Sequence, residues 1–301
     1  MYSRWFNFTV VALWLAAMTW LTWVKIIPRI REGEPPSYQT IAEAQRKNPV
    51  VGWKMLLGGK HLGTAVSEAR LVDDGLTEIH SRVHFDSLPL RELLPAWLDA
   101  VLGLIDEQSL GDDLSMDTTS VLTIDPLGRL TDFESTLAME PLDNSIKLRG
   151  SIEGTKLKMN VSMPGMSRST EAYIPPNALI TDSFSPQAQL PGLRQGQAWK
   201  VPVYSPLRPP NSPMEMYEAS VEGIEVITWG GRGQQVWLVE YRRDSGFSIS
   251  SRAKPQGRLW VRRDDGMVLK QQLLIMNSTL TFVRMTEQEA EENPLPEIED
   301  L

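Results

Sequence analysis

The sequence predicts a mainly β protein: a large curved antiparallel sheet or open half-barrel with one packed helix, preceded by an N-terminal transmembrane helix. Three observations support this. From residue 50 onward, short alternating runs are separated by Asp-Gly and Gly-Gly turns. These runs follow one another without the strand–helix–strand rhythm of a parallel sheet. Residues 5–24 carry no charged side chain. We divide the chain into an anchor (1–25), a juxtamembrane linker (26–49), a β-rich domain (50–285) and an acidic disordered tail (286–301).

The N-terminal segment Trp5–Val24 is long enough, at 1.5 Å per residue, to cross about 30 Å of hydrocarbon. We expect four tryptophans to anchor it: Trp5, Trp14, Trp20 and Trp23. The rival interpretation is a cleaved signal peptide, whose apolar stretch would cover about 7 to 15 residues and end at small residues. Apolar sequence continues past Ala17, which favours an uncleaved, single-pass anchor.

The orientation of this anchor is set by the charges that flank it. Arg4 precedes the segment, whereas Lys25, Arg29 and Arg31 follow it. Because basic residues stay on the cytoplasmic side, this count alone favours a cytoplasmic main domain by a small margin.

The strand pattern begins at Val51 and continues almost to the end of the chain. We expect strands at residues 51–57, 61–72, 76–88, 114–124, 130–139, 145–152, 156–163, 170–174, 199–204, 214–227, 235–241, 258–263, 267–275 and 279–285. Asp73-Asp74-Gly75 and Asp264-Asp265-Gly266 are hairpin turns, since Asp and Gly tolerate positive φ. Within 76–88, odd-numbered residues should face one side and even-numbered residues the other. A short polar helix is expected at 41–47.

One segment has a helical rather than a strand pattern. Between residues 90 and 105, apolar side chains recur every three or four positions and include Trp97, Leu98 and Val101. Pro95 should begin or kink this helix. We expect the helix to pack on the sheet; the alternative is a second helix lying along the membrane.

Composition excludes several functional classes. Hydrophobic residues make up 42% of the chain, enough for a real core, and the net charge is −8. Seven acidic residues and no Lys or Arg lie in 286–301, so the remaining chain is nearly neutral. Nucleic acid is therefore not expected as a partner. With no cysteine, disulfides, thiolate metal sites and cysteine nucleophiles are absent.

Candidate chemical groups are few. Of the three histidines, His80 and His84 share one face of the expected strand 76–88 with Asp86, while His61 precedes them. Histidine and carboxylate at close range ligate zinc. However, positions i and i+4 of a strand lie about 13 Å apart, so we interpret this as a solvated polar face.

Other motifs are interpreted as structural. Gly230-Gly-Arg-Gly233 lacks the following helix that a phosphate loop needs, and is expected to be a hairpin turn. The proline-rich stretch 205–213 is an ordinary loop, a partner-binding edge or a lid. Neither a Gly-x-Ser-x-Gly nor a His-Glu-x-x-His motif occurs. We therefore expect no catalytic residue, no metal site and no cofactor, and no enzymatic activity.

A proline-led segment opens the later strands. Its signature residues are Ile174-Pro-Pro-Asn-Ala-Leu-Ile180, Ser185-Pro186, Leu190-Pro-Gly-Leu193, Gly196-Gln-Ala-Trp199 and Val201-Pro-Val203, together with Lys60-His-Leu-Gly63 after the first strand. This signature resembles a family of uncharacterised bacterial envelope proteins whose domain is similar to the lipoprotein-carrier (LolA-like) half-barrel. The resemblance covers roughly residues 50–285. It implies an extracytoplasmic domain, attached to the inner membrane, with an apolar concavity.

Two functions remain open at this level. The first is a membrane-anchored envelope protein that binds a lipid or another apolar ligand in the half-barrel, with Trp97, Leu98, Val101 and Trp199 as the expected ligand-binding residues. The second is a non-enzymatic scaffold or accessory subunit of an envelope protein complex. A continuous apolar cavity would favour the first, and a solidly packed interior the second.

Overall fold

A computed structural model describes residues 4–22, 38–46, 50–72, 75–86, 115–140, 144–174, 179–180, 186–204, 214–244, 254–275 and 278–292 of the chain. Within these ranges the helices are α1 (Arg4–Leu21), α3 (Tyr38–Gln45) and α6 (Glu287–Glu292). The strands are β1 (Val50–Leu57), β2 (Lys60–Leu71), β3 (Thr77–Phe85), β4 (Ser115–Ile124), β5 (Leu130–Glu140), β6 (Asn144–Glu153), β7 (Lys156–Met163), β8 (Met166–Tyr173), β9 (Leu179–Ile180), β10 (Ala198–Tyr204), β11 (Met214–Trp229), β12 (Arg232–Arg243), β13 (Gly257–Arg262), β14 (Val268–Ile275) and β15 (Ser278–Arg284).

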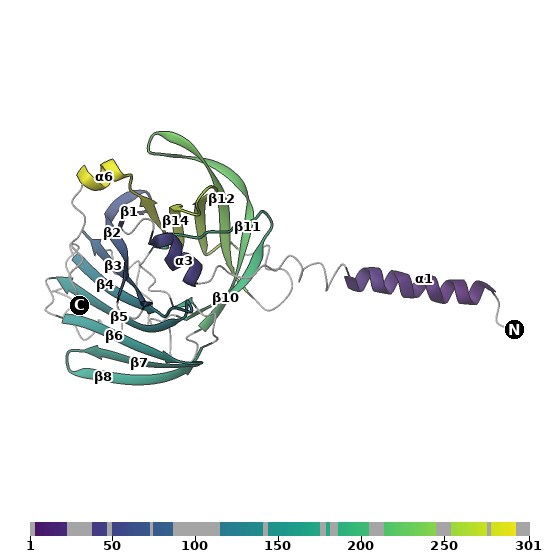
Figure 1. The fold of residues 1–301 in the computed structure, drawn as a ribbon, viewed down its shortest axis with the longest axis horizontal. Coiled ribbons are helices and arrows are strands. Elements are labelled where there is room, and N and C mark those ends of the chain that lie inside the picture. The colour runs from purple at the N-terminus through teal and green to yellow at the C-terminus, as the bar shows by residue number, and fades with distance from the viewer. Residues whose placement is uncertain are drawn as a thin grey trace.

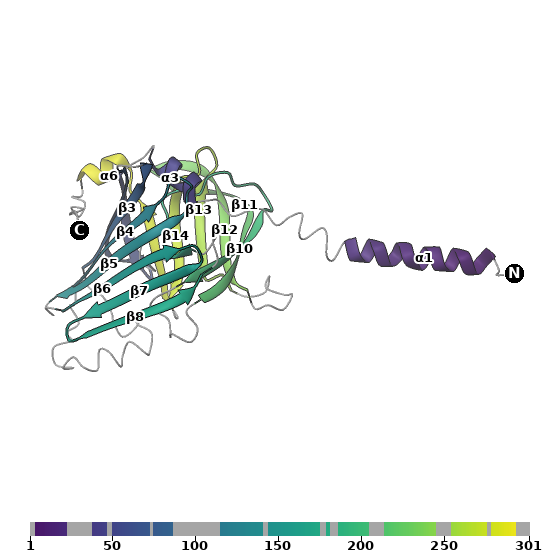
Figure 2. The ribbon, with the colours of Figure 1, turned by 60° about the horizontal axis from the view of Figure 1, so that its bottom comes forward.

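All fifteen strands belong to one sheet with the order β8-β7-β6-β5-β4-β3-β2-β1-β15-β14-β13-β12-β11-β10-β9. Neighbouring strands are antiparallel except β9 and β10, which are parallel. The first strand pairs with the last, so two runs of hairpins join at β1 and β15. Figures 1 and 2 show the sheet curling so that β3–β8 and β10–β13 face one another. The mainly β, open antiparallel sheet predicted from the sequence is therefore confirmed.

A cluster of buried side chains lies on the inner side of the curl. This cluster draws on both halves of the sheet and includes Trp53, Phe85, Met139, Trp199 and Phe282. Trp53, Phe85 and Phe282 have no exposed surface. The face that carries these residues is called the inner face below, and the opposite face the outer face. The described part of the inner face therefore carries a hydrophobic core.

A strap, residues 186–193, pairs with the turn between β13 and β14 and with the beginning of β14. The backbone N–H of Leu190 donates to the carbonyl of Gly266 over 2.7 Å, and that of Val268 donates to Ala188 over 3.1 Å. Ala188 and Leu190 are 3% and 2% exposed. The proline-led signature of the sequence thus supplies a segment that is pinned by backbone hydrogen bonds and contributes to the core.

The strap also covers a buried cation. Arg284 is 5% exposed, and its Nη1 donates to the carbonyl of Ala188 over 3.0 Å. Its guanidinium carbon lies 5.9 Å from the centre of the Trp53 ring. Burial lowers the pKa of Arg284 to about 10, against the opposing effect of the Asp265 carboxylate. The side chain still carries its charge at neutral pH, stabilised by the strap carbonyl and the indole face.

Most strand predictions are confirmed, because the alternation and the turn residues are local signals. In β3 the alternation holds for Val83 and Phe85, which are buried, and His84, which is partly exposed; His80, expected on the solvated face, is buried instead. Gly230 and Gly231 form the predicted hairpin turn with φ of 58° and 72°. The short strand β9 and the beginning of β8 at Met166 were not predicted.

The helix predictions have mixed outcomes. The short polar helix expected at 41–47 appears as α3, whose Ile41 and Gln45 are buried near β2. The helix expected between residues 90 and 105 lies outside the described residues. The N-terminal helix forms over Arg4–Leu21, and Trp5, Trp14 and Trp20 are 78%, 58% and 68% exposed. Among the described residues, no helix combines the length and the apolarity needed to cross a membrane.

The beginning of the acidic segment, expected to be a disordered tail, forms a helix. Thr286 and Glu289 make a capping box: Glu289 N–H donates to Thr286 Oγ1 over 3.2 Å, and Thr286 N–H donates to Glu289 Oε2 over 2.9 Å. Lys54 on β1 pairs with Glu289 Oε1 at 2.7 Å. The capping box stabilises the first turn of α6, and the ion pair attaches this helix to β1.

We expect Gly266→Ala to destabilise the fold more than Gly231→Ala. Both glycines have φ above 70°, so an alanine at either position costs about 1 kcal/mol in backbone strain. A Cβ at Gly266 would also lie 2.5 Å from Pro191 Cα in the strap, whereas one at Gly231 meets nothing within 4 Å. The loss for Gly266→Ala should total about 3 kcal/mol. Urea unfolding followed by tryptophan fluorescence measures it; equal losses for the two variants would contradict the strap packing.

We expect the docking of α6 to weaken in acid. The Lys54 ammonium, followed by the Thr286 backbone N–H, holds the pKa of Glu289 below its ordinary value of 4.5. A carboxylate with a lowered pKa stabilises the folded state above its unfolded pKa, and this contribution is lost as pH falls through the folded value. NMR protection of the α6 amides between pH 7 and 3.5 tests this.

Two variants test whether Glu289 is the group that controls the pH dependence of α6. Glu289→Gln should remove most of the pH dependence of α6, because the titrating partner of Lys54 is gone. Glu291→Gln, on the same helix and exposed, should titrate like the unaltered chain. An unchanged acid transition in Glu289→Gln would show that another group controls the docking.

Candidate functional site

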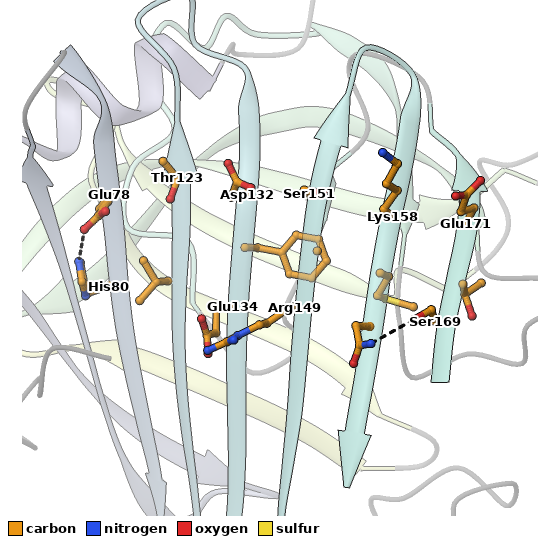
Figure 3. Close-up of a pocket in the computed structure, with 16 residues that line it drawn as sticks. Glu78, His80, Thr123, Asp132, Glu134, Arg149, Ser151, Lys158, Ser169 and Glu171 are labelled. Atoms are coloured by element: carbon orange, nitrogen blue, oxygen red, sulfur yellow. Dashed lines mark hydrogen bonds and ion pairs between the residues drawn. The ribbon is translucent and has the colours of Figure 1, made fainter. Parts of the chain in front are cut away.

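The first candidate site is an open groove of about 770 Å³ on the outer face of β3–β8, called the polar groove (Figure 3). The strand register arranges most of its side chains in two rows. One row runs Glu78, Thr123, Asp132, Ser151, Lys158 and Glu171, and the other runs His80, Val121, Glu134, Arg149, Asn160 and Ser169. Adjacent strands lie about 4.8 Å apart, so each row presents closely spaced polar groups.

The charges of the polar groove are largely neutralised within the protein. Arg149 pairs with Glu134 at 2.7 Å, and His80 Nε2 lies 2.9 Å from Glu78 Oε2. The hydrogen bond with Glu134 raises the pKa of Arg149. Lys158 is paired outside the groove with Glu153 at 2.9 Å. A face of mutually paired, water-exposed side chains is typical of the solvated side of an antiparallel sheet.

The histidines do not meet as a metal site. His84 Nδ1 lies 3.0 Å from Asp117 Oδ2, and His61 Nδ1 lies 3.3 Å from Asp86 Oδ2. His80 is buried and pairs with Glu78 instead. Within the part of the chain that the structure describes, no three His, Asp or Glu side chains are placed to hold a metal ion. The approach of His61 to Asp86 across two strands was not predicted, because it depends on the register of β2 and β3.

The second candidate site is a groove of about 760 Å³, called the hairpin groove. Its floor is the outer face of β1, β15 and β14, and its wall is the end of the β11–β12 hairpin. It is lined by Leu56, Gly58, Gly59, Ile227, Thr228, Trp229, Leu269, Lys270, Gln272, Thr279, Thr281 and Val283. From Thr279 to Val283 along β15 it extends for about 13 Å at 3.3 Å per residue.

The hairpin groove exists because β11 and β12 extend past the strand that flanks them. β11 has 16 residues and β12 has 12, whereas β13 has 6. The register ends at the pair Val236 and Arg262, so the rest of the hairpin has no partner in β13. Figure 1 shows this free end curving over the sheet beside β14.

The end of the hairpin is anchored where it meets the sheet. Trp229 Nε1 donates to the carbonyl of Arg284 over 2.8 Å, and the Arg262 guanidinium lies 5.7 Å from the centre of the Trp229 ring. Ile227 and Trp229 pack against a small outer-face core of Val236, Trp260, Met267 and Leu269. A wall that is already held in place need not be ordered when a ligand binds, which lowers the entropic cost of binding.

The lining of the hairpin groove is mainly apolar. Leu56, Ile227, Trp229, Leu269 and Val283 supply hydrocarbon or indole surface. The neutral polar groups are three threonines and one glutamine: Thr228, Thr279, Thr281 and Gln272. Among the described lining residues, Lys270 is the one charged side chain. Apolar walls with a few polar groups are the usual composition of a small-molecule site.

The predicted ligand-binding residues are not found in either groove. Trp97, Leu98 and Val101 lie outside the described residues. Trp199 is 3% exposed and belongs to the inner-face core, where its ring meets Tyr241 edge to face at 6.5 Å. The hairpin groove was missed by sequence reasoning. Its signal was the unequal length of the expected strands 214–227 and 258–263: a hairpin that begins with the longer strand extends past the shorter one, and the end of β12 is left without a partner in β13.

Comparisons with known proteins give distant likenesses of structure alone. No protein-family model and no curated protein matches the sequence. A beta-barrel-like protein of the domain of unknown function DUF1849 from Brucella abortus is similar over 79% of this chain and 95% of its own, with 10% identity and a TM-score of 0.45. The hypothetical lipoprotein YmcC from Escherichia coli K12 is similar over 79% of this chain and 87% of its own, with 10% identity and a TM-score of 0.23.

Likenesses at these scores support no statement about function. Both neighbours are described as uncharacterised bacterial proteins, and neither name is that of a lipoprotein carrier. The predicted relation to the lipoprotein-carrier half-barrel therefore stays a prediction.

Proposed function

We propose that this chain is a non-enzymatic, membrane-attached binding module that holds the apolar chain of a lipid or another acyl compound in the hairpin groove. The observation that carries the proposal is the lining of that groove: five large apolar side chains, four neutral polar ones and a single charge. Each methylene buried there contributes about 0.8 kcal/mol. The threonines and the glutamine provide hydrogen bonds for orientation.

The location of the ligand differs from the sequence-based expectation. An apolar ligand was expected in the concavity of the half-barrel, beside Trp199. That side chain, together with Ala188 and Leu190 of the strap, is buried in the inner-face core. The hairpin groove lies on the outer face, where Leu56 and Val283 are only partly buried and remain accessible to a ligand.

Membrane attachment by residues 5–24 is part of the proposal. Every described side chain of α1 whose burial is assigned is exposed, including Phe8 at 70% and Leu13 at 69%. A helix that is apolar on all sides is unfavourable in water and suits a lipid or protein environment. Following the resemblance, we place the anchor in the inner membrane and the domain on its extracytoplasmic side, as in an envelope or periplasmic protein.

A second candidate function is a scaffold or accessory subunit of an envelope complex. The hydrophobic core on the described part of the inner face favours it, since buried side chains such as Trp53 and Trp199 contact one another there instead of a ligand. The two functions differ in whether lipid accompanies the protein. Mass spectrometry of the purified full-length chain would detect co-purified lipid for the binding module and none for the scaffold.

We expect Ile227→Asp to weaken binding of a radiolabelled fatty acid by at least about tenfold, because a carboxylate in the groove wall opposes burial of the chain. Val226→Asp is the matched control: Val226 is the preceding residue of β11, is 69% exposed and does not line the groove. Equilibrium dialysis of the two variants in the same uncharged detergent measures the difference.

If Ile227→Asp unfolds the hairpin, a second variant can still test whether the groove binds the ligand. Thr279→Trp adds bulk at the opposite end of the groove, in a strand position that tolerates aromatic residues. It should reduce fatty-acid binding without removing an apolar core side chain. Full binding by both variants, with unfolding midpoints like that of the unaltered chain, would place the ligand elsewhere.

Removal of residues 1–25 should release the chain from membranes. The apolar surface of α1 is the proposed attachment, and no lipidated cysteine is available as a substitute. Carbonate extraction of cell membranes, followed by immunoblotting, compares the full and shortened chains. Retention of the shortened chain in the membrane fraction would contradict the proposal. A topology reporter fused after Leu301 gives the side of the membrane on which the domain lies.

A further inference from the structure

The one charged side chain among the described residues that line the hairpin groove, Lys270, lies over an indole ring. Lys270 lies in a cross-strand row on the outer face, between Trp260 of β13 and Val283 of β15. Its Nζ lies 4.6 Å from the centre of the Trp260 ring. Among the described residues, no carboxylate lies within ion-pair distance of this ammonium. A cation held by an indole face keeps the N–H donors that do not point at the ring available to a ligand.

Neighbouring cations do have acidic partners. Lys54, in the same cross-strand row as Lys270, pairs with Glu289 at 2.7 Å. Arg258 pairs with Glu240 at 2.8 Å, and Arg262 Nε donates to Asp265 over 3.0 Å. Trp260, the residue whose ring lies under Lys270, donates a hydrogen bond from Nε1 to the Glu225 carboxylate over 2.7 Å. Among the described residues, Lys270 therefore has no ion-pair partner, and it is the one charged side chain that lines the groove.

Neutral donors lie on the floor beside Lys270. Gln272 Nε2 donates to Thr281 Oγ1 over 3.3 Å across β14 and β15, and both side chains line the groove. The Thr281 hydroxyl is in turn able to donate to an incoming oxygen. On the other side of Lys270, Val283 and Leu269 are apolar. The groove thus places one cation and one hydroxyl next to hydrocarbon surface.

We propose that the hairpin groove selects a single-chain amphiphile with an anionic head, the head binding Lys270 and the chain lying against Leu56, Ile227 and Val283. This inference rests on the proposed function and adds the identity of the headgroup class. Charge complementarity is its basis: an anion beside Lys270 gains a charge-assisted hydrogen bond, whereas a cationic head would be repelled.

The test compares palmitate with hexadecanol, two probes that share the apolar chain and differ in head charge. Binding of each radiolabelled probe to the full-length chain is measured at pH 8 in one uncharged detergent. We expect the unaltered protein to bind palmitate about tenfold more tightly than hexadecanol. In Lys270→Met the two affinities should become equal, whereas Lys270→Arg should retain the preference for palmitate.

Lys158→Met is the matched control, since it removes the same charge from the polar groove on β7 and should leave the preference unchanged. Equal binding of the two probes by the unaltered protein would overturn the headgroup inference while leaving the proposed function intact. Binding of neither probe would overturn both. A preference for palmitate that persists in Lys270→Met would assign the head to another residue, and would overturn the role given to Lys270.

Discussion

The pairing of β1 with β15 is the constraint on which the rest of the structure depends. It joins strands more than 200 positions apart, with Trp53 opposite Arg284 and Met55 opposite Phe282. Through this one ladder, two separate runs of hairpins become a single sheet. The inner-face core draws residues from both runs, and the floor of the hairpin groove is the outer face of the same ladder. The core and the candidate site therefore lie on opposite faces of the same pair of strands.

The limits of sequence-based prediction follow from the range of each interaction. Alternation in Thr77–Phe85 and the turn at Gly230-Gly231 depend on adjacent residues, and both were predicted. The β1–β15 pairing depends on register between distant strands, for which a single sequence has no local signal. The Trp199 side chain shows the consequence: an apolar residue in the right pattern was expected to touch ligand, whereas tertiary packing places it in the core.

The polar groove and the hairpin groove differ more in the ion pairs of their side chains than in their volumes. The polar groove has a volume of about 770 Å³ and the hairpin groove one of about 760 Å³. In the polar groove Arg149, Lys158 and His80 each have an acidic partner, so a polar ligand would have to displace existing ion pairs. In the hairpin groove there is little to displace, because the walls are apolar and Lys270 lacks a carboxylate partner among the described residues. Two grooves of nearly the same volume therefore differ in the free energy that a ligand would gain on binding.

The β1–β15 ladder also sets the order in which the domain is completed during synthesis. β1 leaves the ribosome early, and its partner is the last strand of the described sheet. Until β15 arrives, Trp53 and Met55 lack the neighbours that bury them, and the edge of β1 is unpaired. An unfinished chain therefore presents an apolar, aggregation-prone strand edge of the kind that chaperones and proteases act upon. Pairing of the last strand covers the edge of β1 and buries the apolar side chains that the unfinished chain exposes.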